Sequence, residues 1–246
     1  MNVLSLFDGM SCGQIALDNL GIKVDNYFAS EIKKHAIQCT LDNFPNTKHI
    51  GDVIKVKGSD LPEIDLLIGG SPCQDFSRAN SVRDGLQGVK SMLFYEYIRL
   101  LEETKPKYYL LENVIMDDLG YNTISELLGT EPVRLCGSKV SAALRDRLFW
   151  TNIGPEWFDL FGNRKSNIPQ PRDKKIMLND ILEYGYSDKK KHTCLNTLSG
   201  YQSPNQKSII HRNNTTGMVT LIYKDENMNE SDGVRFVNQN ELEILH

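Results

Sequence analysis

A cysteine follows a proline directly after an apolar run, where its side chain could do chemistry. The run IDLLI (64–68) continues into GGSPCQDFS, so that Cys73 comes directly after Pro72. Proline fixes its own φ and has no backbone N–H, which stiffens the chain just before the cysteine. The thiol of Cys73 could pack in a core, bind a metal, form a disulfide or act as a nucleophile.

The other cysteines lie far from Cys73 in the sequence. The chain has five cysteines, at positions 12, 39, 73, 136 and 194, and the closest two are 27 positions apart. This spacing differs from that of a paired zinc motif, so we expect no metal site. The odd count and the intracellular character of the sequence argue for free thiols. Packing and nucleophilic roles remain for Cys73.

A carboxylate and two arginines could work together with Cys73. Glu112 lies in the apolar stretch YYLLENV, and a carboxylate in a buried strand is costly unless it is paired or used. Arg145 and Arg147 precede another apolar run, and a guanidinium can hold a carboxylate by forked hydrogen bonds. From these residues alone, a structural ion pair for Glu112 and surface positions for the arginines remain open.

A second group of residues indicates a nucleoside cofactor. The glycine-containing stretch 7–13, FDGMSCG, lies between a predicted strand and a predicted helix, where glycine lets the backbone approach a ligand. Asp8, Glu31 and Asp52 each lie at the end of a predicted strand, where a carboxylate can accept from ribose hydroxyls or an adenine amine. The dinucleotide fingerprint GxGxxG is absent from the sequence, which argues against NAD and FAD.

Alternating apolar runs and helical patterns position these residues. Strands are predicted at 3–7, 24–30, 49–53, 64–70, 108–114, 132–136 and 147–153, and helices near 12–20, 31–43, 91–104 and 121–129. Such alternation predicts an α/β fold with a mainly parallel sheet covered on both faces. Ligands bind at the carboxyl ends of the strands in these folds, which is where Cys73 lies.

The composition changes after about residue 154. The following segment is rich in Asn, Ser, Thr, Gln and Lys, with a helical pattern at 176–185 and a possible strand at 219–223. We predict a catalytic and cofactor-binding domain at 1–154, a small lobe at 155–234 and the start of a return to the first domain at 235–246. The sequence RFVNQNELEILH is helix-like and has no stop signal, so we expect further sequence or a second chain to complete it.

The net charge of the chain does not favour nucleic-acid binding, but one stretch of the sequence is locally basic. The net charge is −4, from 28 basic and 32 acidic residues. The stretch 189–217 nevertheless has no acidic residue and five basic ones: Lys189, Lys190, Lys191, Lys207 and Arg212. This stretch is either a phosphate-facing surface or a solvated loop. No apolar run approaches the roughly 18 residues of a membrane span, and MNVLSLFDG is no secretory signal, so we expect a cytoplasmic protein.

The motifs, taken in their order along the chain, resemble those of the DNA cytosine-5 methyltransferase family. The resemblance rests on LFDGMSCG, the acidic residue Glu31, GDV, GGSPCQDFS, LLENV and LRDRLFW. FDGMSCG and SAALRDR, with Ala143 where bacterial members have glutamine, are most similar to the de novo subgroup. Because the motifs begin at the first strand, without a preceding regulatory region, we expect a bacterial or phage member, in a restriction-modification setting.

The resemblance implies a Rossmann-like, S-adenosylmethionine-dependent methyltransferase fold with a small target-recognition lobe. Cys73 would attack carbon 6 of a cytosine flipped out of double-stranded DNA. Glu112 would engage nitrogen 3 and the exocyclic amine, protonated through burial, while Arg145 and Arg147 position it. S-adenosylmethionine, converted to S-adenosylhomocysteine, would lie against Phe7, Asp8, Gly9, Met10, Cys12, Glu31, Ile32, Asp52, Val53 and Leu93.

Between Gln74 and Lys90 the sequence has the composition of a loop that could close over the flipped base. Residues for phosphate contacts are Arg78, Asn80, Ser81 and Arg83, and Gly85 and Gly88 could act as hinges. An ordinary polar surface loop is the alternative. We expect the basic residues of 189–217 to supply further DNA contacts.

The sequence departs from the family at its end. Only Arg235 and residues 241–245 resemble the family's next helix, and the last cofactor motif is missing. We therefore expect weak cofactor binding or inactivity of this stretch alone, with the remainder in further sequence or a second subunit. A tRNA cytosine-5 methyltransferase and a catalytically inactive DNA-binding relative remain as alternatives.

Overall fold

The computed structural model describes residues 1–72, 92–158, 160, 162, 164–193, 220–224, 226–227 and 234–235. The chain divides into two compact units. One contains Met1–Arg134 with Arg147–Ile168, and the other contains Leu135–Asp146 with Pro169–His246. This division differs from the predicted boundary after residue 154, because each unit takes up a segment from the other side of that boundary. The functional domain boundaries stay a prediction.

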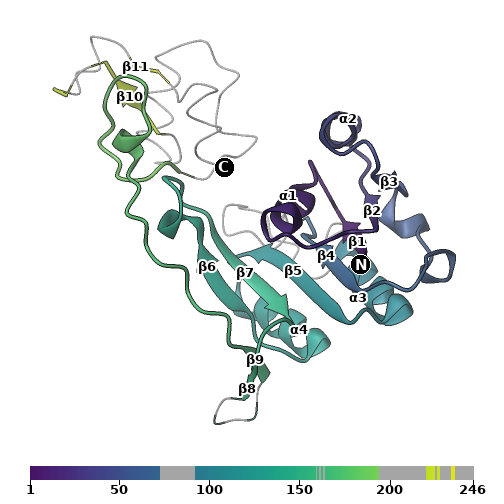
Figure 1. Cartoon of the computed structure of the whole chain (residues 1–246). Coiled ribbons are helices and arrows are strands. Elements are labelled where there is room, and N and C mark those ends of the chain that lie inside the picture. The colour runs from purple at the N-terminus through teal and green to yellow at the C-terminus, as the bar shows by residue number, and fades with distance from the viewer. Residues whose placement is uncertain are drawn as a thin grey trace. The chain divides into compact units, whose positions relative to one another are not determined.

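A seven-stranded sheet forms the framework of the fold. Its strands are β1 (Asn2–Leu6), β2 (Asn26–Ser30), β3 (Lys48–His49), β4 (Leu66–Gly69), β5 (Tyr108–Val114), β6 (Val133–Cys136) and β7 (Asp146–Thr151). Their order is β3-β2-β1-β4-β5-β7-β6 (Figure 1). The neighbours from β3 to β5 are parallel, and β7 runs antiparallel to β5. The predicted mainly parallel α/β sheet is confirmed. The strand order reverses direction between β1 and β4, where such sheets open a crevice at their carboxyl ends.

Four helices connect the strands, all close to their predicted positions. They are α1 (Cys12–Asn19), α2 (Lys34–Asn43), α3 (Met92–Thr104) and α4 (Asp118–Leu128). The bounds of α4 follow from its caps: the Asp117 side chain accepts from the Gly120 N–H at 3.0 Å, and Gly129 ends the helix with φ 61°. Two 3-10 turns, η1 (Val53–Lys55) and η2 (Gly58–Asp60), follow β3. No helix in the described part of the chain is long and apolar enough to cross a membrane.

Apolar side chains from the strands and from α3 and α4 form the main core. Its fully buried members include Leu67, Leu111, Phe94, Tyr97, Ile124 and Trp150. A smaller core, containing Leu17 of α1 with Tyr27 and Leu66, is a separate cluster. Along β5, Tyr109, Leu111 and Asn113 are buried, while the alternate residues, including Glu112, are partly exposed. Glu112 is therefore placed on the less buried face of its strand.

A short hairpin completes the first unit. Its strands are β8 (Glu156–Phe158) and β9 (Arg164–Ser166), which pair antiparallel.

The second unit has little regular structure among its described residues. It contains the 3-10 turns η4 (Gly137–Lys139) and η5 (Leu178–Asp180), the antiparallel pair β10 (Ile222–Tyr223) and β11 (Val234–Arg235), and a small core of Ala142, Leu178 and Ile222. The helix predicted at 176–185 is wrong, because only η5 forms there. The Asn179 side chain bonds both backbone groups of Ser187, at 2.9 and 3.2 Å, and Gly185 has φ 90°. These contacts turn the chain back where a helix would continue.

Candidate active site

The turn between β1 and α1 has a strained backbone at the carboxyl edge of the sheet. Phe7 and Ser11 both have positive φ, at 57° and 60°, as does Gly9 at 62°. A Cβ on Gly13 would lie 2.5 Å from Ile68 Cδ1 and 2.8 Å from the Tyr27 hydroxyl. Glycine at this position therefore lets the first turn of α1 pack closely on the side chains of β2 and β4, and a larger residue would displace Ile68 or Tyr27.

Asp8 holds this turn from inside. Its Oδ1 accepts from the Tyr27 hydroxyl at 2.8 Å, and its Oδ2 accepts from the Ser11 hydroxyl. Burial, and then the Asp8 carboxylate, raise the pKa of Tyr27 well above its usual value, so this hydroxyl remains a donor. The predicted cofactor residue Asp8 thus has a structural contact on each oxygen.

Glu31 joins the two turns that follow β1 and β2. Its Oε2 accepts from the Gly9 N–H at 2.9 Å, and its Oε1 accepts from the N–H groups of Ile32 and Lys33 at 2.8 and 2.9 Å. A carboxylate oxygen can accept about two hydrogen bonds, so Oε2 can also receive a ribose hydroxyl. Met10 and Ile32, which adjoin Gly9 and Glu31 in sequence, are 58% and 69% exposed. Apolar side chains next to a fixed carboxylate fit the nucleoside part of S-adenosylmethionine.

The loop after β3 differs in detail from the prediction. The expected strand 49–53 ends at His49, and Asp52 instead caps η1, with its Oδ1 accepting from the Ile54 N–H at 3.2 Å. Val53, a predicted cofactor residue, is 4% exposed and belongs to the main core, whereas Ile54 is 61% exposed. Ile54 was not among the residues predicted from the sequence, because a 3-10 turn changes which residues face outward and no alternating pattern indicates it.

Hydrogen bonds fix the backbone on both sides of Asp52. The Ser30 hydroxyl donates to the Gly51 carbonyl at 2.8 Å, and Arg99 Nη2 of α3 donates to the Val53 carbonyl at 3.1 Å. Glu96 and Glu103 in turn hold the Arg99 guanidinium, at 2.6 and 2.8 Å. The loop is therefore preorganised. Leu93 packs partly buried against the main core, and Cys12 is an exposed free cysteine at the start of α1.

Glu112 and Arg147 form an ion pair near the ends of β4 and β5. Arg147 Nε lies 2.7 Å from Glu112 Oε1, with 16% and 28% of the two side chains exposed. Arg147 is opposite Val114 in the antiparallel register, so its side chain lies on the same face as Glu112. The burial expected for Glu112 is only partial, because Glu112 lies on the less buried face of β5.

Gly70 and Asn113 complete this part of the site. A Cβ on Gly70 would lie 3.0 Å from Glu112 Oε2, so glycine leaves the room that the carboxylate occupies. Asn113 is 1% exposed, donates from Nδ2 to the Ser71 hydroxyl at 3.2 Å and accepts from the Val114 N–H at 2.8 Å. It fixes the chain two residues before Cys73. Asn113 lies in the motif LLENV but was not among the residues predicted from the sequence.

The other predicted residues belong to the second unit or lie outside the described residues. Arg145 belongs to the second unit, where it is exposed and its carbonyl accepts from the Gly137 N–H at 2.9 Å. Lys189 is partly buried, which lowers its pKa, and Lys190 is exposed. The residues outside the described ranges are Cys73, Arg78, Asn80, Ser81, Arg83, Lys207 and Arg212.

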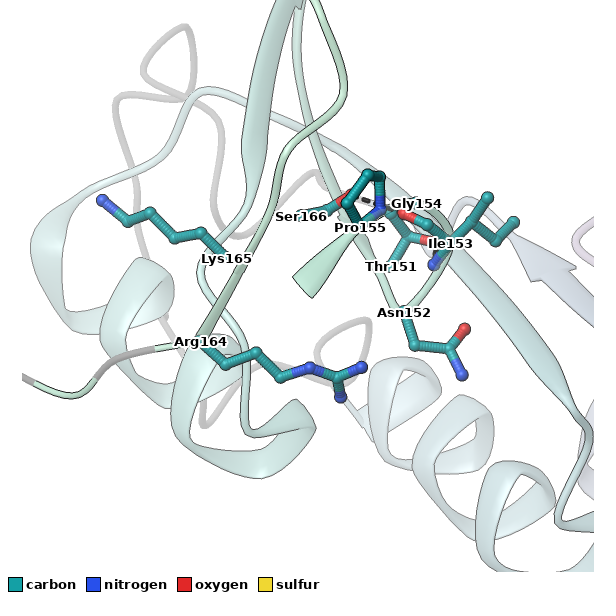
Figure 2. Close-up of a pocket in the computed structure, with 8 residues that line it drawn as sticks. All are labelled: Thr151, Asn152, Ile153, Gly154, Pro155, Arg164, Lys165 and Ser166. Carbon is teal, nitrogen blue, oxygen red and sulfur yellow. Dashed lines mark hydrogen bonds between the residues drawn. The ribbon is translucent and has the colours of Figure 1, made fainter. Parts of the chain in front are cut away.

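Two open hollows lie away from this site. Figure 2 shows one, lined by Thr151–Pro155 and Arg164–Ser166, with the Ser166 hydroxyl bonded to the Ile153 carbonyl. A second, of ≈ 470 Å³, is lined by the end of α4, Phe158 and Arg164. Thr151, at the end of β7, pairs with Leu110 near the start of β5. The first hollow therefore lies toward the amino end of β5, whereas Glu112 lies toward its carboxyl end. Neither contains a predicted site residue.

The fold and the site define a class of protein. It is an α/β domain in which the turns after β1, β2 and β3 could hold a nucleoside. Near the ends of β4 and β5 it has a carboxylate, Glu112, paired with Arg147. The family model for C-5 cytosine-specific DNA methylases matches residues 1–117, which include the glycine turn, Glu31, Asp52 and Glu112.

Curated relatives and solved structures agree with this class. The orphan methyltransferase M.Rho11sI of Bacillus phage rho11s is 42% identical over 74% of this chain and 34% of the relative. The type II methyltransferase M1.ScrFI of Lactococcus lactis subsp. cremoris is 44% identical over 68% of this chain and 45% of the relative. The chain thus spans between a third and a half of the length of these two relatives.

A solved structure shows the same fold at low sequence identity. The S. pombe Dnmt2 methyltransferase superposes with a TM-score of 0.64 and 17% identity, covering 100% of this chain and 86% of that one. The chain belongs to the C-5 cytosine-specific DNA methylase family, as its motifs predicted. The proposed likeness to the de novo subgroup stays a prediction, and these comparisons give no support for a second subunit.

Proposed function

We propose that this protein is a DNA (cytosine-5-)-methyltransferase that methylates carbon 5 of a flipped-out cytosine through a covalent cysteine adduct. The observation that carries this proposal is the Glu112–Arg147 ion pair. It lies beside Gly70, which precedes Cys73 by three residues in the sequence of this family member. The relatives span more sequence than this chain, so the proposal concerns the protein to which these residues belong.

Cys73 is the nucleophile in this proposal. Carbon 5 of cytosine is too weakly nucleophilic to take a methyl group directly. Addition of the Cys73 thiolate to carbon 6 makes carbon 5 nucleophilic, and after methylation carbon 5 loses its proton and the thiolate leaves. One difficult step is thereby divided into easier ones.

Glu112 engages the cytosine ring while Arg147 fixes its orientation. In this proposal the protonated carboxyl group donates its proton to nitrogen 3 and accepts from the exocyclic amine, and the proton on nitrogen 3 withdraws electron density from the ring as the thiolate adds to carbon 6. Arg147 holds Oε1 at 2.7 Å, so the carboxyl group has a fixed direction before the base arrives. The family resemblance also implies a supporting role for Arg145 at the base.

The carboxyl edge of β1, β2 and β3 holds S-adenosylmethionine, which supplies an electrophilic methyl group when bound. Glu31 accepts from the ribose, Gly9 lets the backbone approach, and Met10, Ile32 and Ile54 offer exposed apolar surface to the adenosine. Asp8 and Val53 shape this edge from inside. Phe7, Cys12, Asp52 and Leu93 remain proposed neighbours of the cofactor.

Double-stranded DNA is the proposed substrate. A cytosine inside a duplex is out of reach of Cys73, so the base must be flipped out at a cost of a few kcal/mol. Phosphate contacts from Arg78, Asn80, Ser81, Arg83, Lys189, Lys190, Lys207 and Arg212 remain proposals based on the sequence.

A methyl-transfer assay with two substrates tests the proposal. The protein, expressed from its complete natural gene, is incubated with radiolabelled S-adenosylmethionine and either duplex DNA or tRNA. We expect label at cytosine carbon 5 of DNA, and its loss in Cys73→Ser. Preferential labelling of tRNA would assign the RNA activity instead. DNA binding without transfer to either substrate would identify an inactive relative.

A further inference from the structure

The loop before β7, Gly137–Arg145, is closed by its own backbone hydrogen bonds in the second unit. The Gly137 N–H donates to the Arg145 carbonyl at 2.9 Å, and the Ser141 N–H donates to the Gly137 carbonyl at 2.9 Å. Arg145 therefore sits at one end of a closed loop. Its backbone position depends on whatever holds the rest of that loop in place.

Lys191 holds this loop through three carbonyl oxygens. Its Nζ donates to the carbonyl of Ser138 at 2.6 Å, to that of Ser141 at 3.0 Å and to that of Ile176. Two of these acceptors belong to the loop, and the third lies on a separate segment of the same unit. An ammonium group has three N–H donors, and these three contacts use all of them.

The residue after Lys191 adds a backbone link to the same loop. The His192 N–H donates to the Ala142 carbonyl at 2.6 Å, and the Leu144 N–H donates to the His192 carbonyl at 2.8 Å. These bonds form a short parallel bridge between Ala143 and His192. The loop is consequently held at several points by two consecutive residues that lie about 50 positions further along the chain.

The position of Lys191 differs from that of its neighbour Lys190. Lys190 is exposed, while Lys191 is partly buried and its contacts are charge-assisted hydrogen bonds to the backbone. A phosphate could take a donor from Lys191 only if one of these bonds broke. The prediction that Lys191 contacts DNA therefore does not fit its surroundings, although its place in a basic run suggested that role.

We propose that Lys191 is a positioning residue for the loop that carries Arg145, and not a phosphate contact. The catalytic part of this inference rests on the proposed methyltransferase function, in which Arg145 assists at the base. The structural part, that Lys191 fixes the loop Gly137–Arg145 by hydrogen bonds, does not depend on that function.

The test compares Lys191→Met with Lys190→Met, which removes the neighbouring ammonium group. Hydrogen exchange of peptides covering 137–146 should become faster in Lys191→Met and stay as in the wild type in Lys190→Met. The dependence of DNA affinity on salt should weaken by about one unit of log–log slope in Lys190→Met and be unchanged in Lys191→Met. In Lys191→Met, kcat should fall roughly a hundredfold while the Kd for S-adenosylhomocysteine stays unchanged.

Opposite results would overturn the inference. A Lys191→Met protein with wild-type exchange and a reduced salt slope would make Lys191 a phosphate contact. A wild-type protein without methyl transfer would remove the proposed function, yet the exchange and salt measurements would still decide the place of Lys191. If Lys191→Met does not fold, Lys191→Gln, which keeps two donors, should show intermediate exchange, and wild-type exchange there would also overturn the inference.

Discussion

At the scale of single residues, the proposed catalytic side chains could be selected from the sequence, but the geometry of their contacts could not. Glu112 stood out because a carboxylate ended an apolar run, and the arginines stood out as a closely spaced pair. The register of β7 against β5 places Arg147 on the face of Glu112, where its Nε lies 2.7 Å from Glu112 Oε1. Likewise, Lys190 and Lys191 look equivalent in sequence, but their contacts differ.

Gly70 offers a sharp test of the Glu112 geometry. In Gly70→Ala the new methyl group would lie 3.0 Å from Glu112 Oε2, so the carboxylate must move by a few tenths of an ångström. We expect kcat for DNA methylation to fall about tenfold, because catalysis depends on the direction of this group. Steady-state kinetics together with thermal unfolding would separate this effect from a loss of stability.

A double-mutant cycle provides the control for Gly70→Ala. If the methyl group acts through the carboxyl group, Gly70→Ala should cost little more once Glu112→Gln is present. Additive losses in the double variant would mean that Gly70 acts by another route.

At the scale of elements, the apolar runs predicted the strands and helices because each strand of a covered parallel sheet is a short hydrophobic run. Strand ends then gave the places of Asp8, Glu31 and Glu112. The failures lie in irregular segments: η1 buried Val53 and exposed Ile54, and the Asn179–Ser187 bonds replaced a predicted helix by η5. Contacts of this kind depend on side chains meeting backbone groups, which periodicity does not report.

Glu31 connects two elements, so its substitution should affect both binding and stability. In Glu31→Gln the amide nitrogen cannot accept, and the bond from Gly9 or those from Ile32 and Lys33 must be lost. We expect the free energy of unfolding to fall by about 2 kcal/mol and the Kd for S-adenosylhomocysteine to rise roughly tenfold. Calorimetric titration and chemical denaturation measure the two effects.

Asp65→Asn is the matched control for Glu31→Gln. Asp65 Oδ2 also accepts a backbone N–H, from Asn2 at 2.7 Å, but at the amino end of the parallel strands. Loss of this hydrogen bond in Asp65→Asn should lower the free energy of unfolding without changing the Kd for S-adenosylhomocysteine. Equal effects of both variants on the Kd would show that Glu31 acts only through stability.

At the scale of the whole molecule, the described residues supply a cofactor edge and a carboxylate–arginine pair on one sheet. Family membership and the phage and bacterial relatives give these features a common chemistry. Cys73 follows directly on Pro72 in the sequence, and it is the residue on which the proposed covalent mechanism depends.

Covalent trapping tests the central claim most directly. The protein from the complete gene is incubated with S-adenosylmethionine and duplex DNA containing 5-fluorocytosine, in which fluorine replaces the proton that must leave carbon 5. The thiolate then cannot be expelled, so we predict a one-to-one adduct stable to denaturant, mapped by mass spectrometry to Cys73 and lost in Cys73→Ser. DNA methylation without such an adduct, or an adduct at another residue, would contradict the account.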